Sequence, residues 1–358
     1  MRIVIVRLDN LGDQVLGAGV LPTLRALHPH ARLILVVPEA LAGLYARCPL
    51  IDGLLALPHH DTYLRDSARL RAILDSLRSH AQSDLVLNPR FGEDYYLAGP
   101  ICRSLAADGA RVVGYRQMAS PYPGYDANAF YGELVDAPNG LHASRYAGII
   151  AAHVGASASA EPVVWFSPDD IAAVRGRYRL DHRSFVTIGC GASFMFKCPA
   201  PETYRYIVNQ IGATYRRRIV LIGLAADRAV AEAIIAGASP GVLIDSTLGE
   251  LSLAELAALM SLTELYVGPD AGPMHMAAAA GTAVIELGWV PANYPTTSRG
   301  DGTAGRCWAP WTARAMTVRP AATQFAQRTR IPGFRQRPIG GFSTADIDTA
   351  LAAMLAGR

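Results

Sequence analysis

The sequence predicts an α/β protein made of two Rossmann-like domains, each a parallel sheet covered by helices. Along both halves of the chain, short apolar runs alternate with helical segments, the pattern of parallel strands joined by crossover helices. A chain of 358 residues is also too long for one ordinary core. The low-complexity run 155–160, followed by Pro162, marks the boundary between the two halves.

The first half predicts an N-terminal domain, residues 1–160. Residues 118–139 interrupt its alternating pattern with Pro121, Pro123, Gly124 and several tyrosines, which indicates an irregular insertion rather than a linker. The expected strands are residues 3–6, 33–37, 53–57, 85–87 and 111–113, and the expected helices are residues 13–27, a segment ending near 45, and residues 64–79 and 145–154.

The second half repeats the pattern and predicts a C-terminal domain, residues 161–340. A final segment, residues 341–358, contains a helix over 343–355 with the capping-box-like start Ser343-x-x-Asp346, and we expect it to pack back on the N-terminal domain. The expected strands are residues 185–188, 219–222 and 242–244, with helices over 202–213, 226–235 and 253–262.

The composition excludes several classes of protein. Hydrophobic residues make up 51% and charged residues 18%, which is typical of a globular chain, and a net charge of +3 argues against nucleic acid as a partner. The five cysteines are dispersed without CxxC pairs, which indicates a reducing compartment and no zinc cluster. Neither a signal peptide nor a long apolar span is recognisable. We expect a cytoplasmic protein, attached at most peripherally to the inner membrane.

One segment has an unusual charge pattern. Residues 302–345 contain no Asp or Glu, which favours a solvated basic rim, although a surface facing an anionic acceptor or an anionic membrane leaflet fits the same pattern. The arginines of this segment are Arg306, Arg314, Arg319, Arg328, Arg330, Arg335 and Arg337.

Residues 265–288 carry the most informative pattern, which reads as strand, tight loop, short helix, turn and second strand. Asp270, Ala271 and Gly272 form the loop, and Pro273 suits the first turn of the helix. Free backbone N–H groups and the positive helix end then lie at the carboxyl edge of a parallel sheet, where such sheets bind phosphates. His275 lies in the first turn and adds a donor. The segment predicts a site for a diphosphate.

A second constellation follows the first strand. Gly12 permits a sharp turn there, and Asp13 falls at the helix N-terminus, whose dipole keeps a carboxylate ionised. Asp13 is either a simple helix cap or a functional carboxylate facing an interdomain cleft. The segment lacks the GxGxxG pattern of nicotinamide-binding enzymes.

The first strand of the second half leads into a third constellation. Ser193 offers a hydroxyl to a phosphate oxygen and Lys197 a point charge, although a solvent-exposed loop lysine is the plain alternative. Asp227 follows the next strand. It either accepts from ribose hydroxyls or caps a helix, and the sequence favours neither.

Together these motifs resemble glycosyltransferase family 9, the ADP-heptose:lipopolysaccharide heptosyltransferases. The resemblance rests on Arg7 with Gly12-Asp13, on Gly191-Ala-Ser193 with Lys197 and Cys198-Pro199, and on Asp270-Ala-Gly-Pro-Met-His275 continuing to Ala283. It implies a GT-B fold and inverting, metal-independent transfer of a heptose or related sugar from an NDP-sugar such as ADP-heptose. No cofactor is implied beyond this donor. The acceptor is expected to be a saccharide or glycolipid of lipopolysaccharide core or capsule.

The resemblance also assigns roles to residues. Asp13 would be the general base, and the donor phosphates would lie against Ser193, Lys197 and the loop of Asp270, Ala271, Gly272 and His275. Arg7, Asn10, Asn88 and Arg90 would face the acceptor. The only DxD, Asp346-Ile-Asp348, falls in the final helix and is a poor metal loop.

Several positions depart from the family pattern. Ala271 replaces the usual Thr, Cys198 replaces Trp, and Leu87-Asn-Pro-Arg-Phe91 stands where relatives often have an Asp-x-Gln type sequence. These departures leave the acceptor and the sugar open. The alternatives are a transferase that modifies a secondary metabolite or a protein, an NDP-sugar epimerase of the same fold, and a non-catalytic binding protein. The nucleotide base and the oligomeric state are not predicted.

Overall fold

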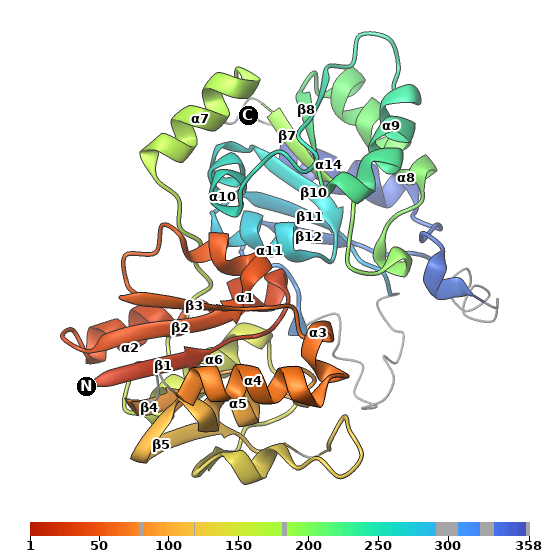
Figure 1. The fold of residues 1–358 in the computed structure, drawn as a ribbon. Helices are drawn as coiled ribbons and strands as arrows, with labels where there is room; N and C mark the ends of the chain where they lie inside the picture. Colours follow the sequence, from red (N-terminus) through yellow and green to blue (C-terminus); the bar gives the residue numbers. More distant parts are fainter. Residues whose placement is uncertain (79–81, 118, 181–184, 291–306, 323–332, 356–358) are drawn as a thin grey trace. The chain divides into compact units, whose positions relative to one another are not determined.

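The chain forms two compact units, Met1–Trp165 and Phe166–Arg358. The structure is a computed structural model that describes all residues except 79–81, 118, 181–184, 291–306, 323–332 and 356–358. Two parts of the acid-free segment, residues 302–306 and 323–332, and position 118 of the expected insertion therefore lie outside the described residues. Within the described part, each unit holds a parallel six-stranded sheet with helices packed on it, which confirms the α/β prediction (Figure 1).

In the first unit, short runs of Val, Ile and Leu form the central strands, because buried parallel strands favour branched apolar side chains. Its strands are β1 (Arg2–Val6), β2 (Arg32–Pro38), β3 (Gly53–Leu57), β4 (Ser83–Leu87), β5 (Ala106–Tyr115) and β6 (Glu133–Val135). Its helices are α1 (Leu11–Gly17), α2 (Val20–Leu27), α3 (Asp61–Leu64), α4 (Ser67–Arg78), α5 (Ala98–Leu105) and α6 (Ala143–His153).

The second unit repeats the arrangement. Its strands are β7 (Phe185–Gly189), β8 (Arg218–Ile222), β9 (Ile244–Ser246), β10 (Leu265–Pro269), β11 (Ala283–Leu287) and β12 (Ala315–Val318). Its helices are α7 (Pro168–Tyr178), α8 (Pro201–Asn209), α9 (Arg228–Ala236), α10 (Leu253–Leu262), α11 (Gly272–Ala279) and α14 (Thr344–Leu355). None of the helices in the described parts of either unit is long and apolar enough to cross a membrane.

Both sheets have the same strand order. The first runs β3-β2-β1-β4-β5-β6, and the second runs β9-β8-β7-β10-β11-β12. In each sheet the order in which successive strands are added reverses between the two central strands, β1 and β4 or β7 and β10. Ligands of open α/β sheets bind at this switch point, beyond the strand carboxyl ends. The loops that follow these four strands contain most of the residues expected to form a site.

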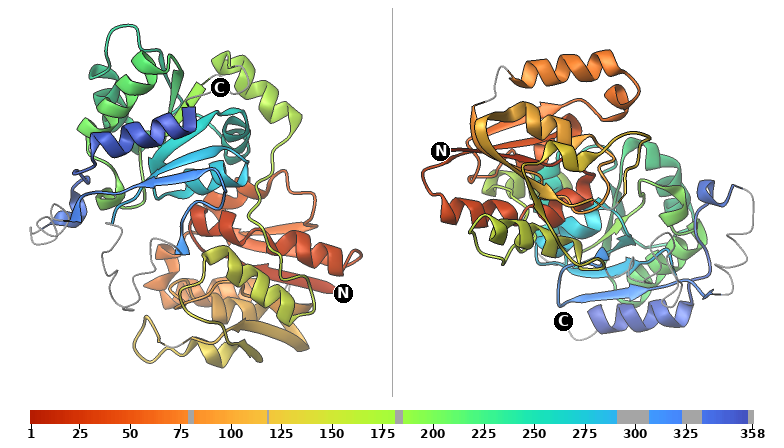
Figure 2. Two further views of the ribbon diagram at one scale, coloured as in Figure 1. Left: turned by 180° about the vertical axis from the view of Figure 1, so that it is seen from behind. Right: turned by 90° about the horizontal axis from the view of Figure 1, so that it is seen from below.

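The final helix corrects one prediction. Residues 341–358 were expected to return to the N-terminal domain, but α14 packs on β11 and β12 of the second unit (Figure 2). Its apolar residues recur at helical spacing, so one face of the helix is buried in that unit's core, and Tyr206 Oη donates to Asp348 Oδ2 at 2.7 Å. The buried residues of this face are Ile347, Ala350, Leu351 and Leu355.

Several further elements were missed or merged in the sequence analysis. The segment expected to be irregular, residues 118–139, contains strand β6, and neither β12 nor α7 was predicted. The helix expected over residues 13–27 is two helices, α1 and α2. They are separated next to Gly19, where a Cβ atom would lie 2.4 Å from the carbonyl carbon of Ala160 and from the oxygen of Glu161. The backbone between α1 and α2 is therefore in direct contact with residues near the end of the first unit, Ala160 and Glu161.

Replacement of Gly19 by Ala should therefore destabilise the protein. The added methyl group meets backbone rather than a movable side chain, so we expect a loss of about 1–3 kcal/mol in urea unfolding. Gly176, in the exposed part of α7, has no atom within 4 Å of its Cβ position and provides the control. Gly176→Ala should stabilise by about 0.5–1 kcal/mol. Equal effects of the two substitutions would contradict the close packing at Gly19.

Candidate functional site

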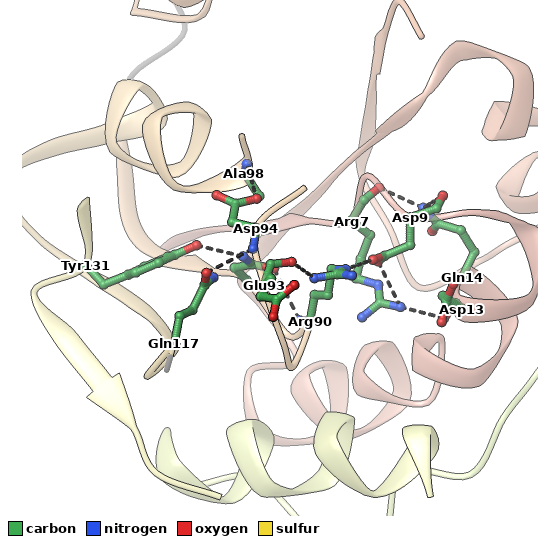
Figure 3. Close-up of polar contacts among 11 residues, drawn as sticks. Arg7, Asp9, Asp13, Gln14, Arg90, Glu93, Asp94, Ala98, Gln117 and Tyr131 are labelled. Atoms are coloured by element: carbon green, nitrogen blue, oxygen red, sulfur yellow. Dashed lines mark hydrogen bonds and ion pairs between the residues drawn. The ribbon is translucent and has the colours of Figure 1, made fainter. Parts of the chain in front are cut away.

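The first cluster lies in the loop between β1 and α1. Arg7 is 6% exposed; its NH2 lies 3.1 Å from Asp9 Oδ2 and donates to the backbone oxygen of Asp13 at 2.5 Å (Figure 3). Gly17 makes room for it, because a Cβ there would lie 2.6 Å from the Arg7 Cζ. Arg7 is thus a buried scaffold that holds the first turn of α1 in place.

Asp9 is the centre of this cluster. It is 1% exposed and pairs with two cations, because Arg90 Nε also lies 2.5 Å from its Oδ1. Gln14 fixes the loop from the other side: its Nε2 donates to the backbone oxygen of Arg7 at 2.7 Å, and its Oε1 accepts from Tyr45 Oη at 2.7 Å. The sequence prediction missed both Asp9 and Gln14, which are buried polar residues flanking the motif.

The loop after β4 supplies the other arginine. Asn88 Oδ1 accepts from the backbone N–H of Arg90 at 3.2 Å, and Asn88 Nδ2 donates to Tyr131 Oη at 2.7 Å. The Arg90 guanidinium donates to the backbone oxygen of Glu93 and lies 5.1 Å from the ring centroid of Tyr96. Asn88 therefore positions Arg90 rather than offering its own amide to a ligand.

Asp13 lies beside this network, because its backbone oxygen accepts from Arg7. It lies in the first turn of α1 and is partly exposed, while Asn10 is exposed and makes no side-chain capping bond. Burial would lower the pKa of Arg90, but the carboxylates of Asp9 and Asp13 raise it, so Arg90 carries a permanent charge close to Asp13. Of the residues expected on this side, Arg7, Asp13, Asn88 and Arg90 come together, and Asn10 lies at the edge.

Tyrosines of the segment expected to be an insertion, residues 118–139, contact the loop after β4. Asp94 is 1% exposed and accepts from the N–H groups of Ala98 and Gly99 at the start of α5, and from Tyr125 Oη at 2.6 Å. The backbone N–H of Asp94 in turn donates to Gln117 Oε1 at 2.9 Å. The aromatic residues of the segment therefore fix the backbone that carries Arg90.

In the second unit, the loop after β7 approaches the loop after β8. A Cβ at Gly191 would lie 2.3 Å from both carboxylate oxygens of Asp227, so only glycine permits this approach. Asp227 Oδ2 accepts from the backbone N–H of Leu224 at 2.8 Å, which is the capping role that the sequence left open. Ser193 is exposed further along the first loop.

Lys197 is the cation of this loop and the only lysine in the chain. Its Nζ lies 2.7 Å from Asp270 Oδ2, so the loop after β7 is bound to the loop after β10. The same ammonium is 5.9 Å from the ring centroid of Trp289. A single lysine among 33 basic residues was a sequence signal for this position that the motif analysis did not use.

The loop after β10 leads directly into α11. Ala271 is the N-cap residue, with φ −151° and ψ 165°, and makes no side-chain capping bond. Gly272 is the first helical residue, and the backbone N–H groups of this turn are the predicted anion donors. His275 is 3% exposed, with its Nε2 3.9 Å from Asp270 Oδ1. Lys197, Asp270 and His275 thus meet at the N-terminus of α11.

A buried acid next to this group was not predicted. Glu286 of β11 is 3% exposed, and its Oε2 accepts from Thr317 Oγ1 at 2.7 Å. Burial and the charge of Asp270 raise the pKa of Glu286 to about 7. From the sequence, Glu286 was one polar residue within an apolar strand, which carries no signal for burial.

Potential metal ligands gather elsewhere. In the described part of the chain, His59, His60 and Asp61, at the start of α3, have ligand atoms within 4.8 Å of one another. His59 and Asp61 are exposed, and the group lies outside the four loops described above. The five cysteines are buried and free.

The two units have the architecture of the GT-B fold, and comparisons with known proteins identify the family. The model of glycosyltransferase family 9 (heptosyltransferase) matches residues 112–329, so the chain belongs to this family. Membership makes it a glycosyltransferase rather than an epimerase or a simple binding protein. The matched range contains the loops of the second unit but not Asp13 or Arg90. A search of curated protein sequences found no match.

Solved structures share the fold. A family 9 glycosyltransferase from Veillonella parvula is 17% identical, with a TM-score of 0.75 over 100% of this chain and 98% of the other. ADP-heptose lps heptosyltransferase II from E. coli is 18% identical, with a TM-score of 0.70 over 99% and 98%. The E. coli heptosyltransferase WaaC with ADP is 18% identical, with a TM-score of 0.67 over 91% and 96%. These similarities confirm the predicted GT-B fold.

The raised pKa of Glu286 has a measurable effect on stability. Glu286 ionises near pH 4.5 in the unfolded chain but near pH 7 in the folded protein, so folding favours the protonated form. The contribution of Glu286 to stability is therefore lost as the pH rises from about 4.5 to 7.

Replacing Glu286 by Gln should remove this loss. We expect the variant to gain up to about 3 kcal/mol over the parent protein at pH 8 and almost nothing at pH 4.5, measured by urea unfolding. A variant whose stability follows that of the parent protein at every pH would contradict the raised pKa.

Proposed function

We propose that this family 9 glycosyltransferase transfers a heptose from ADP-heptose to a saccharide or glycolipid of lipopolysaccharide core or capsule. The observation that carries the proposal is the meeting of Lys197, Asp270 and His275 at the N-terminus of α11. The description of the family as heptosyltransferases supports the sugar, and the ADP in the WaaC structure supports the nucleotide.

The second unit supplies the chemistry of the leaving group. As the bond between the anomeric carbon and the diphosphate breaks, its electron pair moves to the phosphate oxygen. The Lys197 ammonium and the backbone N–H groups of Ala271 and Gly272 would stabilise this developing charge, and each preorganised donor of this kind contributes about 3–4 kcal/mol. His275 would orient Asp270 and would contact the same diphosphate as Lys197. With the Lys197 ammonium and these N–H donors in place, transfer would need no metal ion.

The first unit supplies the base. Asp13 would accept the proton of the acceptor hydroxyl as that oxygen attacks the anomeric carbon from the face opposite the diphosphate, which inverts the configuration. The fixed backbone around Arg7 and Gln14 supports this role, because a general base must hold its position to within a fraction of an ångström. Arg90 carries a charge beside it that would attract an anionic acceptor.

A panel of nucleotide diphosphates tests the donor. ADP should raise the melting temperature more than UDP, GDP or TDP, since a ligand at about 100 times its Kd stabilises by about 2.7 kcal/mol. Lys197→Met should abolish the shift while leaving the melting temperature without ligand nearly unchanged. If another diphosphate stabilises more strongly than ADP, the donor assignment is wrong; if none does, the proposed function fails.

Replacing Asp13 by Asn tests the base. The substitution keeps the shape but removes the proton acceptor, so we expect transfer to fall by about 10²–10⁴-fold with ADP affinity nearly unchanged. Asp346→Asn, which disrupts the DxD pair in α14, is the matched control and should keep full activity, with or without EDTA. Full turnover by the Asp13 variant would refute the assignment, and a requirement for added metal would refute metal-independent transfer.

A further inference from the structure

Glu286 is a carboxyl group that the proposed reaction does not use, although it lies close to the donor loops. It occupies the carboxyl half of β11, where its partners in the sheet are Gly268 on β10 and Thr317 on β12. Its side chain is almost completely buried. A buried acid is costly unless a partner or a proton compensates it. The Thr317 hydroxyl is a neutral donor and compensates only part of an ionised carboxylate.

The direction of the Glu286 side chain follows from the strand. Ile285 and Leu287 belong to the core on the side of α8 and α14, and alternate residues of a strand point to opposite faces. Glu286 therefore points to the other face, where α11 packs on β10 and β11. Gly268, its neighbour on β10, contributes no side chain on that face.

The charged groups around Glu286 come from every neighbouring element. Asp270 follows β10, Lys197 lies in the loop after β7, Arg319 follows β12, and all three act on the carboxyl group of Glu286. His275 of α11 lies against Asp270. The Arg319 guanidinium also donates to the backbone oxygen of Val290 at 3.0 Å, which holds it beside the end of β11.

With these charges around it, the protonation state of Glu286 determines how strongly the group attracts an anion. With Glu286 ionised, two carboxylates balance Lys197 and Arg319, and the group offers a diphosphate no net attraction. With Glu286 protonated, one positive charge remains. An incoming diphosphate also repels an ionised Glu286, so anion binding and protonation of Glu286 favour each other.

We propose that Glu286 is a positioning residue of the donor site that takes up a proton from solvent when a nucleotide diphosphate binds, so that donor affinity falls as the pH rises above neutrality. The proposal rests on the proposed function, because it assumes that the diphosphate lies at the start of α11. Glu286 acts through the charge balance of Lys197 and Asp270 and does not itself contact the reacting atoms.

Calorimetric titration with ADP and with inorganic pyrophosphate between pH 6 and 9 tests the proposal. The affinity of the parent protein should fall by up to about tenfold per pH unit above neutrality, relative to Glu286→Gln, and the parent protein should take up more protons on binding. At pH 8.5 Glu286→Gln should bind more than about tenfold more tightly than the parent protein, whereas at pH 6 the two proteins should bind alike. Ionisation of the diphosphate itself affects both proteins equally.

Glu264 offers a matched control. It is equally buried, at 3% exposure, but it lies just before the amino end of β10, whereas Glu286 lies near the carboxyl ends of the strands. Its carboxylate is paired with Arg217 at 2.6 Å. Glu264→Gln should lower stability, because it leaves Arg217 without its partner, yet keep the parent protein's pH dependence of ADP binding. A change common to both variants would mean that loss of a buried acid, and not its position, is responsible, which would overturn the proposal.

The single lysine provides a readout without ligand. Reductive methylation with ¹³C-formaldehyde labels only Lys197 and the N-terminal amine. Without ligand, the Lys197 methyl signal should shift with an inflection near neutral pH in the parent protein and in Glu264→Gln, but not in Glu286→Gln.

The two experiments separate the inference from the function. Diphosphate binding with the same pH dependence in the parent protein and Glu286→Gln, or a Lys197 signal whose titration is unchanged in Glu286→Gln, would overturn the role of Glu286 and leave the proposed function standing. Failure of every diphosphate to bind at any pH would overturn both.

Discussion

The structure depends on one constraint, the reversal of strand order at the centre of each parallel sheet. Helices cover both faces of such a sheet, so the loops that follow the two central strands are the places where backbone and polar side chains can meet a ligand. Both units have this topology with the same strand order. In the first unit the two loops are joined by Asp9 and Arg90, and in the second by Lys197 and Asp270.

The Asp9–Arg90 and Lys197–Asp270 ion pairs differ in burial, and therefore in how easily a ligand can compete with them. Asp9 is almost inaccessible and shared between Arg7 and Arg90, so breaking it would leave buried charges unpaired. It is a fixed support for the residues around it. Lys197 and Asp270 are partly exposed, with side chains 23% and 13% accessible, so an incoming anion can compete for the ammonium. The first pair builds a rigid loop, and the second suits a site whose charges rearrange on binding.

The sequence predicted the α/β class, most strands and the loops that carry the candidate site, because strand periodicity and turn residues are local signals. It missed Asp9 and Glu286, whose importance comes from partners distant in the chain, such as Arg90 for Asp9 and Asp270 for Glu286. It also placed the final helix on the wrong domain. An apolar helical face shows that a helix will be buried but does not show against which sheet, and α14 found its partner in β11 and β12.

Ala271 and Glu286 together affect how strongly the proposed donor loop would bind an anion. A Thr or Ser at the N-cap would satisfy a backbone N–H of α11 and add a hydroxyl near an anion, whereas Ala271 leaves those N–H groups to other acceptors. An ionised Glu286 would cancel part of the positive charge that remains. With no capping hydroxyl and with a buried acid beside it, the proposed donor loop would attract a diphosphate strongly only when that acid is neutral. The absence of a capping hydroxyl would therefore make the protonation of Glu286 more important here than it would be beside a loop that carries one.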